Sequence, residues 1–444
     1  MTQKNNRRDF LKSTAAAGVG FWVAGGVSSR ARANSPNEKI NFASIGLGGA
    51  GRHDSANAGK SGNMVAICDV DSGTLDRIGQ QFNGAKKYTH YRQMFEEMGD
   101  KIDAITISTP DHMHAPIAAQ AMSMGIHTFC QKPISHSIGE ARRLGEIAKA
   151  NKVMTQMGNQ GTAENGLREG AALLRAGVLG AVREVHVWSD RPGWPQGGDP
   201  APAKEPPAHL DWEAWLGVAP ERDFCESYHP GVWRGWWDFG TGALGDMACH
   251  AVNLPFMGLD LRNPTSVEAT TSPNNKNSYP KSSTIKFAFP ANDWRPAIEF
   301  TWSDGGKKPD PKIMEGSGKS MGGSGGVIIG DKASLCFGNE HGANYTIWPD
   351  VPKPQVEYTR SPGHFTEFVN AIKGGPVPVS NFPDYAGPLT ETILLGNLAV
   401  WAGSKVEWDP VKLLATNNKD LESIINKAYP KDYGIAQKLL HINR

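Results

Sequence analysis

The sequence predicts an α/β protein of two domains, and three observations lead to this fold class. A glycine-rich turn follows the first apolar segment, apolar segments then alternate with helical patterns as far as residue 157, and the strands after that point are irregular and separated by long Pro- and Gly-rich connections. We therefore expect a doubly wound parallel sheet over residues 38–157. An α+β domain with an open, mainly antiparallel sheet should follow over residues 158–385, and a helical segment over residues 386–444.

The composition favours a small-molecule partner. The chain has 444 residues, 39% of them hydrophobic, which is enough for a core in each of two domains. Its 46 basic and 45 acidic residues give a net charge of +1, so no polycationic surface indicates nucleic acid or an anionic membrane.

The first 33 residues are expected to be a signal peptide. "RRDFLK" at Arg7–Lys12 is a twin-arginine motif, a weakly apolar stretch follows at Ser13–Val27, and Ala31-Arg32-Ala33 is a peptidase site. A membrane anchor is the alternative, but about 15 apolar residues are fewer than the roughly 20 that a spanning helix needs. We predict twin-arginine export to the periplasm, cleavage after Ala33 and no stable membrane insertion.

The cysteines are predicted to be buried, reduced thiols. The chain has five, an odd number without the dense spacing of a disulfide scaffold, and Cys68 and Cys130 fall in apolar, strand-like runs.

The segment Asn41–Ala58 predicts a strand, a tight turn and the start of a helix. The turn reads Gly46-x-Gly48-x-x-Gly51. Gly46 permits the turn, Gly48 allows the backbone to approach a pyrophosphate, and Gly51 lets the helix pack on the strand. This is the pattern of a dinucleotide-binding Rossmann unit.

Asp69 predicts which dinucleotide binds. It ends a second apolar strand at Met64–Ile67, where its carboxylate can accept hydrogen bonds from the adenosine ribose. The 2'-phosphate of NADP would lie against this charge, and Val70-Asp71-Ser72 supplies no Arg or Lys to offset it. We predict NAD, with NADP disfavoured.

Two later turns are expected to line the nicotinamide, because ligands of such sheets bind outside the carboxyl ends of the strands. The strands Asp103–Ser108 and His127–Cys130 lead into these turns, and Val153–Met157 closes the sheet. The residues expected to contact the cofactor there are Thr109, Pro110, His114, Gln131 and Lys132. His112 and His114 could bind a metal, but no further ligand is arrayed nearby, so we predict none.

The stretches "GLGGAGR", "CDVD", "STPDHMHA", "CQKPISHSIGEARRL" and "GALGDMACH" resemble the glucose-fructose oxidoreductase / inositol dehydrogenase (Gfo/Idh/MocA) family. The resemblance implies that Lys132 lies between nicotinamide and substrate, that Asp246 binds substrate and that His250 is the catalytic imidazole. It also implies a sugar or cyclitol substrate, a homodimer or homotetramer, and a C-terminal segment that packs near the nucleotide domain. Gln131 departs from the family's Glu-Lys-Pro turn.

The residues themselves allow a second interpretation of this group. Asp246 and His250 are four residues apart, so on a helix they share one face and the carboxylate can polarise the imidazole, but such a pair is often a structural salt bridge. Lys132 alone could be a solvated charge. A tryptophan-rich group could equally form a carbohydrate-binding platform or pack in the core. Its members are Trp233, Arg234, Trp236, Trp237 and Asp238.

Together these features predict hydride transfer between a sugar, cyclitol or glycoside and NAD. Free NAD is scarce outside the cytoplasm, so we expect the cofactor to be tightly held. A redox-neutral glycosidase or lyase acting through a transient keto-sugar is one alternative, and a non-catalytic carbohydrate-binding protein is another.

Overall fold

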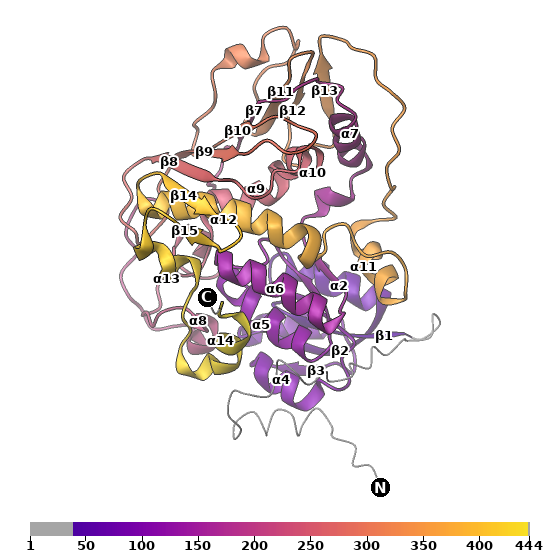
Figure 1. The fold of residues 1–444 in the computed structure, drawn as a ribbon. Coiled ribbons are helices and arrows are strands. Elements are labelled where there is room, and N and C mark those ends of the chain that lie inside the picture. Colours follow the sequence, from indigo (N-terminus) through magenta and orange to yellow (C-terminus); the bar gives the residue numbers. More distant parts are fainter. Residues whose placement is uncertain (1–38, 443–444) are drawn as a thin grey trace.

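The structure is a computed structural model and describes residues 39–442 (Figure 1). The twin-arginine motif and its cleavage site lie outside the described residues. Within residues 39–442, no helix combines the length and the apolar character needed to cross a bilayer.

The first domain is a parallel sheet in the order β3-β2-β1-β4-β5-β6, the doubly wound arrangement that the sequence predicts. Its strands are short and mostly buried because helices cover both faces. The strands are β1 (Ile40–Ile45), β2 (Gly62–Cys68), β3 (Lys86–Tyr88), β4 (Ala104–Ile107), β5 (His127–Cys130) and β6 (Thr155–Met157). The helices are α2 (Gly51–Ser61), α3 (Ser72–Gly79), α4 (Tyr91–Met98), α5 (Asp111–Ser123) and α6 (Ile138–Asn151).

Local signals explain where two of these helices begin. The Asp71 side chain accepts a hydrogen bond from the backbone N–H of Thr74 and caps α3. Ser137 and Glu140 form a reciprocal capping box at the start of α6. The helix α3 thus starts soon after β2 ends, whereas a turn of seven residues separates the end of β5 from α6.

The second domain is a nine-stranded mixed sheet, antiparallel except where β7 pairs with β10, in the order β13-β12-β11-β7-β10-β9-β8-β14-β15. The predicted fold class is thereby confirmed. The strands are β7 (Glu184–Trp188), β8 (Ser266–Thr271), β9 (Ser283–Phe289), β10 (Ile298–Ser303), β11 (Gly325–Ile329), β12 (Ser334–Phe337), β13 (Tyr345–Trp348), β14 (Val406–Asp409) and β15 (Leu414–Ala415). The helices are α7 (Asn165–Arg175), α8 (Trp212–Leu216), α9 (Gly242–Ala251), α10 (Asn253–Leu259), α11 (His364–Ile372), α12 (Gly387–Ala402), α13 (Glu422–Ile425) and α14 (Gly434–Leu440).

The C-terminal segment differs from the helical one that we expected. After α12 the chain adds β14 to the edge of β8 and turns into β15, and only then does α14 pack against α5 and α6 of the first domain. In Figure 1, α12 crosses the middle of the molecule between the two domains, and it contacts α6 on one side and α9 on the other. The segment thus belongs to both domains.

The core and the thiols agree with the sequence. One continuous hydrophobic cluster runs from the first sheet through α12 to the second sheet. All five cysteines are free and buried, as the sequence predicts.

Candidate active site

A cleft of about 750 Å³ lies at the carboxyl ends of β1, β2, β4 and β5, and residues of the second domain form its other wall. Most residues that the sequence singles out line it: Gly46, Gly48, Asp69, Thr109, Pro110, His114, Gln131, Lys132, Trp233, Arg234 and His250. Its size fits a dinucleotide together with a small substrate.

The glycine turn has the geometry that a pyrophosphate needs. Gly46 adopts a φ of +77°, and a Cβ there would lie 2.6 Å from the carbonyl oxygen of Ser108. A Cβ on Gly51 would lie 2.0 Å from the Gly46 carbonyl oxygen, so α2 can start only where the side chain is absent. Gly48 has no heavy atom within 4 Å of its added Cβ, and its backbone is therefore open to the cleft.

Asp69 joins this turn to the end of β2. Its Oδ2 accepts a hydrogen bond from the Leu47 backbone N–H at 2.7 Å, and its Oδ1 accepts one from Asp71 N–H at 2.9 Å. Burial raises the pKa of this carboxyl, and the two backbone donors partly oppose that rise. The remaining lone pairs can accept hydrogen bonds from ribose hydroxyls. The open glycine turn and this acceptor fit the adenosine half of NAD.

His114 lines the cleft, and its ring also lies between the two nicotinamide-side turns. Its Nδ1 lies 2.7 Å from the Pro133 carbonyl oxygen and its Nε2 lies 2.8 Å from that of Thr109. A neutral imidazole has one N–H, so the ring donates to one of these oxygens and packs against the other, between the two nicotinamide-side turns. His112 is likewise held between the carbonyl oxygens of Phe239 and Trp215. In residues 39–442 no group of three or more potential metal ligands is present.

Gln131 connects its turn to a buried carboxylate. Its Nε2 donates to Asp54 Oδ2 at 2.8 Å, and the Ser108 hydroxyl donates to the same oxygen at 2.7 Å. Burial raises the pKa of Asp54, against these hydrogen bonds. An acidic group thus remains near the turn although residue 131 itself carries no charge.

Lys132, Asp246 and Arg234 form an ion-pair network at the domain boundary. Lys132 Nζ donates to Asp246 Oδ1 at 2.7 Å and to the Asp246 carbonyl oxygen at 2.8 Å, and Arg234 Nε lies 3.1 Å from the same Oδ1. Burial alone would raise the pKa of Asp246, but the charges of Lys132 and Arg234 lower it to about 2. Asp246 is therefore ionised at neutral pH, and it holds both cations beside the cleft.

His250 does not pair with Asp246, contrary to our expectation that the carboxylate would polarise the imidazole and raise its pKa. The Asp246 carboxylate faces Lys132 and Arg234 instead. Burial, followed by the charges of Lys132 and His341, lowers the pKa of His250 well below its usual value. Its Nδ1 is buried without a hydrogen-bond partner among residues 39–442. The ring lines the cleft as a neutral imidazole that can accept a proton.

The predicted substrate platform is divided by the structure. Trp233 and Arg234 line the cleft, and the Arg234 guanidinium lies 4.3 Å from the centre of the Trp233 ring. Trp236 is buried and donates to the Ser227 carbonyl oxygen. Asp238 pairs with Arg222, and Trp237 stacks on Tyr279 in a different cavity. These three residues are packing or pairing residues away from the cleft.

Asp111 lies within the stretch "STPDHMHA", and we did not predict it as a site residue, but the structure places it in the cleft. It begins α5, lines the cleft, and its Oδ2 accepts a hydrogen bond from the Thr241 hydroxyl at 2.6 Å. Burial raises the pKa of this carboxyl to about 7. The signal was available, because the residue directly after Pro110 starts a helix at a strand end.

Segments from distant parts of the chain cover the adenosine end of the cleft. The backbone of residues 209–211 bonds to the turn after β2: Ser72 N–H donates to the His209 carbonyl oxygen at 2.8 Å, and Asp211 N–H donates to that of Val70 at 3.0 Å. On the other side, Arg92 donates to the Asp432 carbonyl oxygen at 2.8 Å and lies 4.5 Å from the centre of the Tyr433 ring. Spacing along the sequence carries no signal for these contacts. We call the two segments, residues 209–217 and 430–433, the covering segments.

The open glycine turn, the acidic strand end and a cleft walled by a second domain define a dinucleotide-binding protein of the two-domain oxidoreductase class. Family models agree over most of the chain: residues 40–159 match the "Oxidoreductase family, NAD-binding Rossmann fold", and residues 181–435 match the "Oxidoreductase family, C-terminal alpha/beta domain". The chain belongs to the Gfo/Idh/MocA oxidoreductase family, and its first domain is an NAD-binding Rossmann domain.

Individual relatives are more distant. The chain is 29% identical over 153 residues to the rhizopine catabolism protein MocA of Rhizobium meliloti, covering 33% of this chain and 48% of the relative. It is 34% identical over 149 residues to an α-N-acetylgalactosaminidase of Tannerella forsythia, covering 28% and 31%. These alignments span half or less of the curated relatives. The fold is similar to the WlbA dehydrogenase of Bordetella pertussis, solved with NADH and UDP-GlcNAcA, with a TM-score of 0.59, 17% identity, and coverage of 84% and 99%.

Proposed function

We propose that this protein is an NAD-dependent oxidoreductase that transfers hydride between its cofactor and a CH–OH carbon of a sugar, cyclitol or glycoside. The observation that carries the proposal is the convergence of Lys132, held by ionised Asp246, and neutral His250 in one cleft beside the nicotinamide-side turns. NAD, when bound, supplies the hydride acceptor or donor.

The residues of the chain then have distinct tasks. Two of the three N–H groups of the Lys132 ammonium donate to the carboxylate and carbonyl oxygens of Asp246. The third remains for a substrate hydroxyl. His250 accepts the proton of that hydroxyl as its carbon is oxidised, and returns it in the reverse direction. Arg234 completes the neutralisation of Asp246 and, with Trp233, presents a stacked cation and ring toward the substrate.

We also propose that the cofactor is tightly held and that the protein acts in the periplasm after twin-arginine export. The "RRDFLK" motif supports export. The covering segments support retention, because residues of both line the cleft and are held by hydrogen bonds to the turn after β2 and to Arg92. Asp69 supports NAD over NADP. A homodimer or homotetramer is proposed from the family resemblance alone.

A redox-neutral glycosidase or lyase is the second candidate. The similarity to the α-N-acetylgalactosaminidase of Tannerella forsythia favours it. A tightly held cofactor favours it as well, because an enzyme that oxidises and then reduces one ring needs no exchange of cofactor. A non-catalytic carbohydrate-binding protein is the third candidate.

A single preparation tests these proposals. The purified mature protein is denatured mildly and the supernatant is analysed for NAD, and the intact protein is titrated with a panel of hexoses and glycosides while the reduced-nicotinamide absorbance is followed. We expect released NAD and growth of the reduced band with a sugar. Release of aglycone without net reduction would support the glycosidase, binding without either signal would support the binding protein, and an empty protein that needs millimolar NAD would contradict retention.

A further inference from the structure

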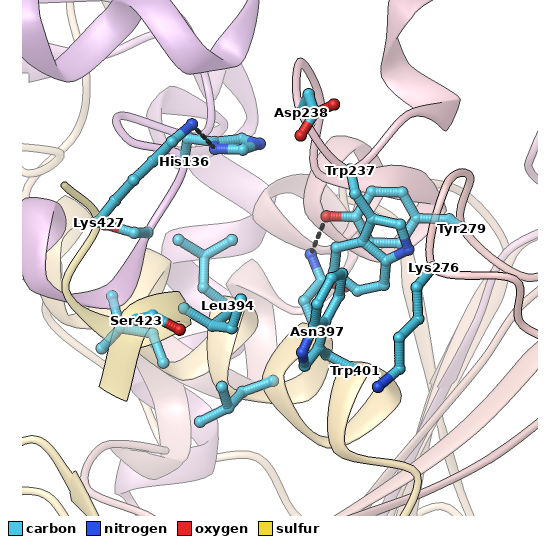
Figure 2. Close-up of a pocket in the computed structure, with 14 residues that line it drawn as sticks. His136, Trp237, Asp238, Lys276, Tyr279, Leu394, Asn397, Trp401, Ser423 and Lys427 are labelled. Carbon is cyan, nitrogen blue, oxygen red and sulfur yellow. Dashed lines mark hydrogen bonds between the residues drawn. The ribbon is translucent and has the colours of Figure 1, made fainter. Parts of the chain in front are cut away.

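A second cavity, of about 150 Å³, lies outside the cleft (Figure 2). It is enclosed by the start of α6, one face of α12, residues near α13, and the Trp237–Asp238 segment. None of the proposed chemistry uses it. Its two ends differ, because Lys427 and His136 lie at one end and the indole rings of Trp237 and Trp401 lie at the other (Figure 2).

Lys427 is a partly buried ammonium without an acidic partner. Its Nζ lies 3.4 Å from His136 Nδ1, and His136 Nε2 lies 3.0 Å from the Gly240 carbonyl oxygen. The ring therefore donates through Nε2 and accepts from Lys427 through Nδ1. Within residues 39–442 no carboxylate lies within ion-pair distance of Nζ.

The acidic groups nearest to Lys427 are already engaged. Glu140 accepts hydrogen bonds from the backbone N–H groups of His136 and Ser137 and from the Tyr429 hydroxyl. Asp238 pairs with Arg222. A cation removed from water without a partner is costly, so the end of the cavity at Lys427 favours an anion.

The aromatic end also lacks an acceptor. Trp237 stacks on Tyr279 with ring centres 3.7 Å apart and meets Trp401 edge to face at 5.1 Å. Its Nε1–H is buried and has no partner among the described residues. The unpaired groups named so far are thus donors. Lys276 brings a second cation to the aromatic end, where its Nζ lies 5.1 Å from the centre of the Trp401 ring. The one carboxylate of the lining, Asp238, is paired with Arg222, and aliphatic side chains complete the wall: Leu394, Leu398 and Ile424.

We infer that this cavity is a binding site for a compact organic carboxylate, of the size of a single sugar acid. The ammonium of Lys427 takes the carboxylate, and the indole rings of Trp237 and Trp401 pack against the ring or carbon chain. A neutral sugar would leave Lys427 unpaired, and a bare inorganic anion would leave the aromatic wall unused.

The cavity is next to the start of α9, the helix that carries Asp246 and His250. Three side chains of its lining hold the main chain before α9: His136 and Tyr279 contact the Gly240 carbonyl oxygen, and Asn397 donates to that of Thr241 at 2.8 Å. A bound carboxylate therefore contacts the groups that fix the entry to the catalytic helix.

Calorimetric titration of the full mature protein with D-glucuronate tests the inference. D-glucose, acetate and inorganic phosphate are titrated in parallel. We expect glucuronate to bind at least tenfold more tightly than the other three probes. Lys427→Met should weaken it tenfold or more, since a charge-assisted hydrogen bond is lost. The matched control is Lys438→Met, at an exposed lysine of α14, which should leave binding unchanged.

Two further variants separate the cavity from the cleft. Ser423→Phe, at the exposed rim, should block binding by filling the cavity, and it replaces Lys427→Met if that variant does not fold. Lys132→Met should leave glucuronate binding intact. Binding that is lost in Lys132→Met but kept in Lys427→Met would assign the ligand to the cleft and overturn the inference. Equal binding of glucose, or tighter binding of phosphate than of glucuronate, would overturn it as well.

Discussion

Asp246→Asn should cost both stability and activity, and the structure sets the size of the first effect. The pKa of Asp246 is lowered from 3.8 to about 2, which corresponds to about 2 kcal/mol of net favourable interaction between the ionised carboxylate and its surroundings. Lys132 Nζ is closer to Oδ1 than Arg234 Nε is, at 2.7 Å against 3.1 Å, so Lys132 should carry the larger share. We expect a coupling energy of about 1–2 kcal/mol between Asp246 and Lys132.

A double-mutant cycle measures that coupling. The wild type, Asp246→Asn, Lys132→Met and the double variant are unfolded in urea at pH 7 and at pH 5.5. The folded-state pKa is depressed, so the stabilisation is present above pH 3.8 and is lost only as the pH falls toward 2. The coupling should therefore be equal at both pH values. A coupling below about 0.5 kcal/mol, or one that fades by pH 5.5, would refute the ion-pair network as described.

Three further predictions concern the histidines and the cofactor. His250→Asn should keep bound NAD and slow single-turnover hydride transfer by about 10²- to 10⁴-fold, the usual contribution of a general base. Because the pKa of His250 is lowered, deprotonation of His250 should not make the wild-type rate rise through pH 6.5. Any change of the rate near pH 7 should follow Asp111, whose pKa is about 7, and should disappear in Asp111→Asn. Asp69→Ala should lower the affinity for NAD and reduce the ratio of the NAD affinity to the NADP affinity, both measured by equilibrium binding. The reason is that the carboxylate accepts hydrogen bonds from the ribose hydroxyls and repels a 2'-phosphate. Burial lowers the pKa of His112 to about 3 and of His114 to about 4. As the pH is lowered from 6.5, the unfolded chain binds protons at these rings before the folded chain does. Each ring should therefore reduce the free energy of unfolding by about 1.4 kcal/mol per pH unit in that range.

Each of these has a clear contrary result. Wild-type hydride transfer in His250→Asn would make the imidazole structural, and a tenfold rise of the rate through pH 6.5 that persists in Asp111→Asn would contradict the lowered pKa of His250. An unchanged NAD preference in Asp69→Ala would remove that residue from the ribose site. A melting temperature that is constant from pH 7 to pH 5, or equally steep in His112→Gln, would contradict the buried-histidine argument.

The cofactor half of the cleft could be predicted from the sequence because its physics is local. Backbone geometry within one turn requires Gly46 and Gly51, Gly48 leaves the backbone open to the cleft, and Asp69 follows at the end of the next strand. The alternation of apolar strands and helices likewise determines a doubly wound sheet.

The wall of the cleft that the second domain forms could be predicted only in part, because its geometry depends on contacts between distant segments. The spacing of Asp246 and His250 correctly indicates a helix, but it cannot show that the carboxylate faces Lys132, more than a hundred residues earlier. Tryptophan-rich loops do not reveal which ring reaches the cleft: Trp233 and Trp236 both lie in one buried cluster, and of these two only Trp233 also lines the cleft. We did not predict β14, because a strand of four residues is too short to show a clear alternation of apolar and polar side chains.

The path of the chain between the domains limits how the cleft can open. After the second sheet, α11 packs on the first domain through Phe368, which contacts the cluster around Phe42, and the chain then returns through α12 and β14 before α14 docks on α5 and α6. A hinge that parted the two halves would have to bend all of these crossings at once. Ligands should therefore enter by local displacement of the surface loops, and limited proteolysis should nick the protein without releasing either half as a separate folded body.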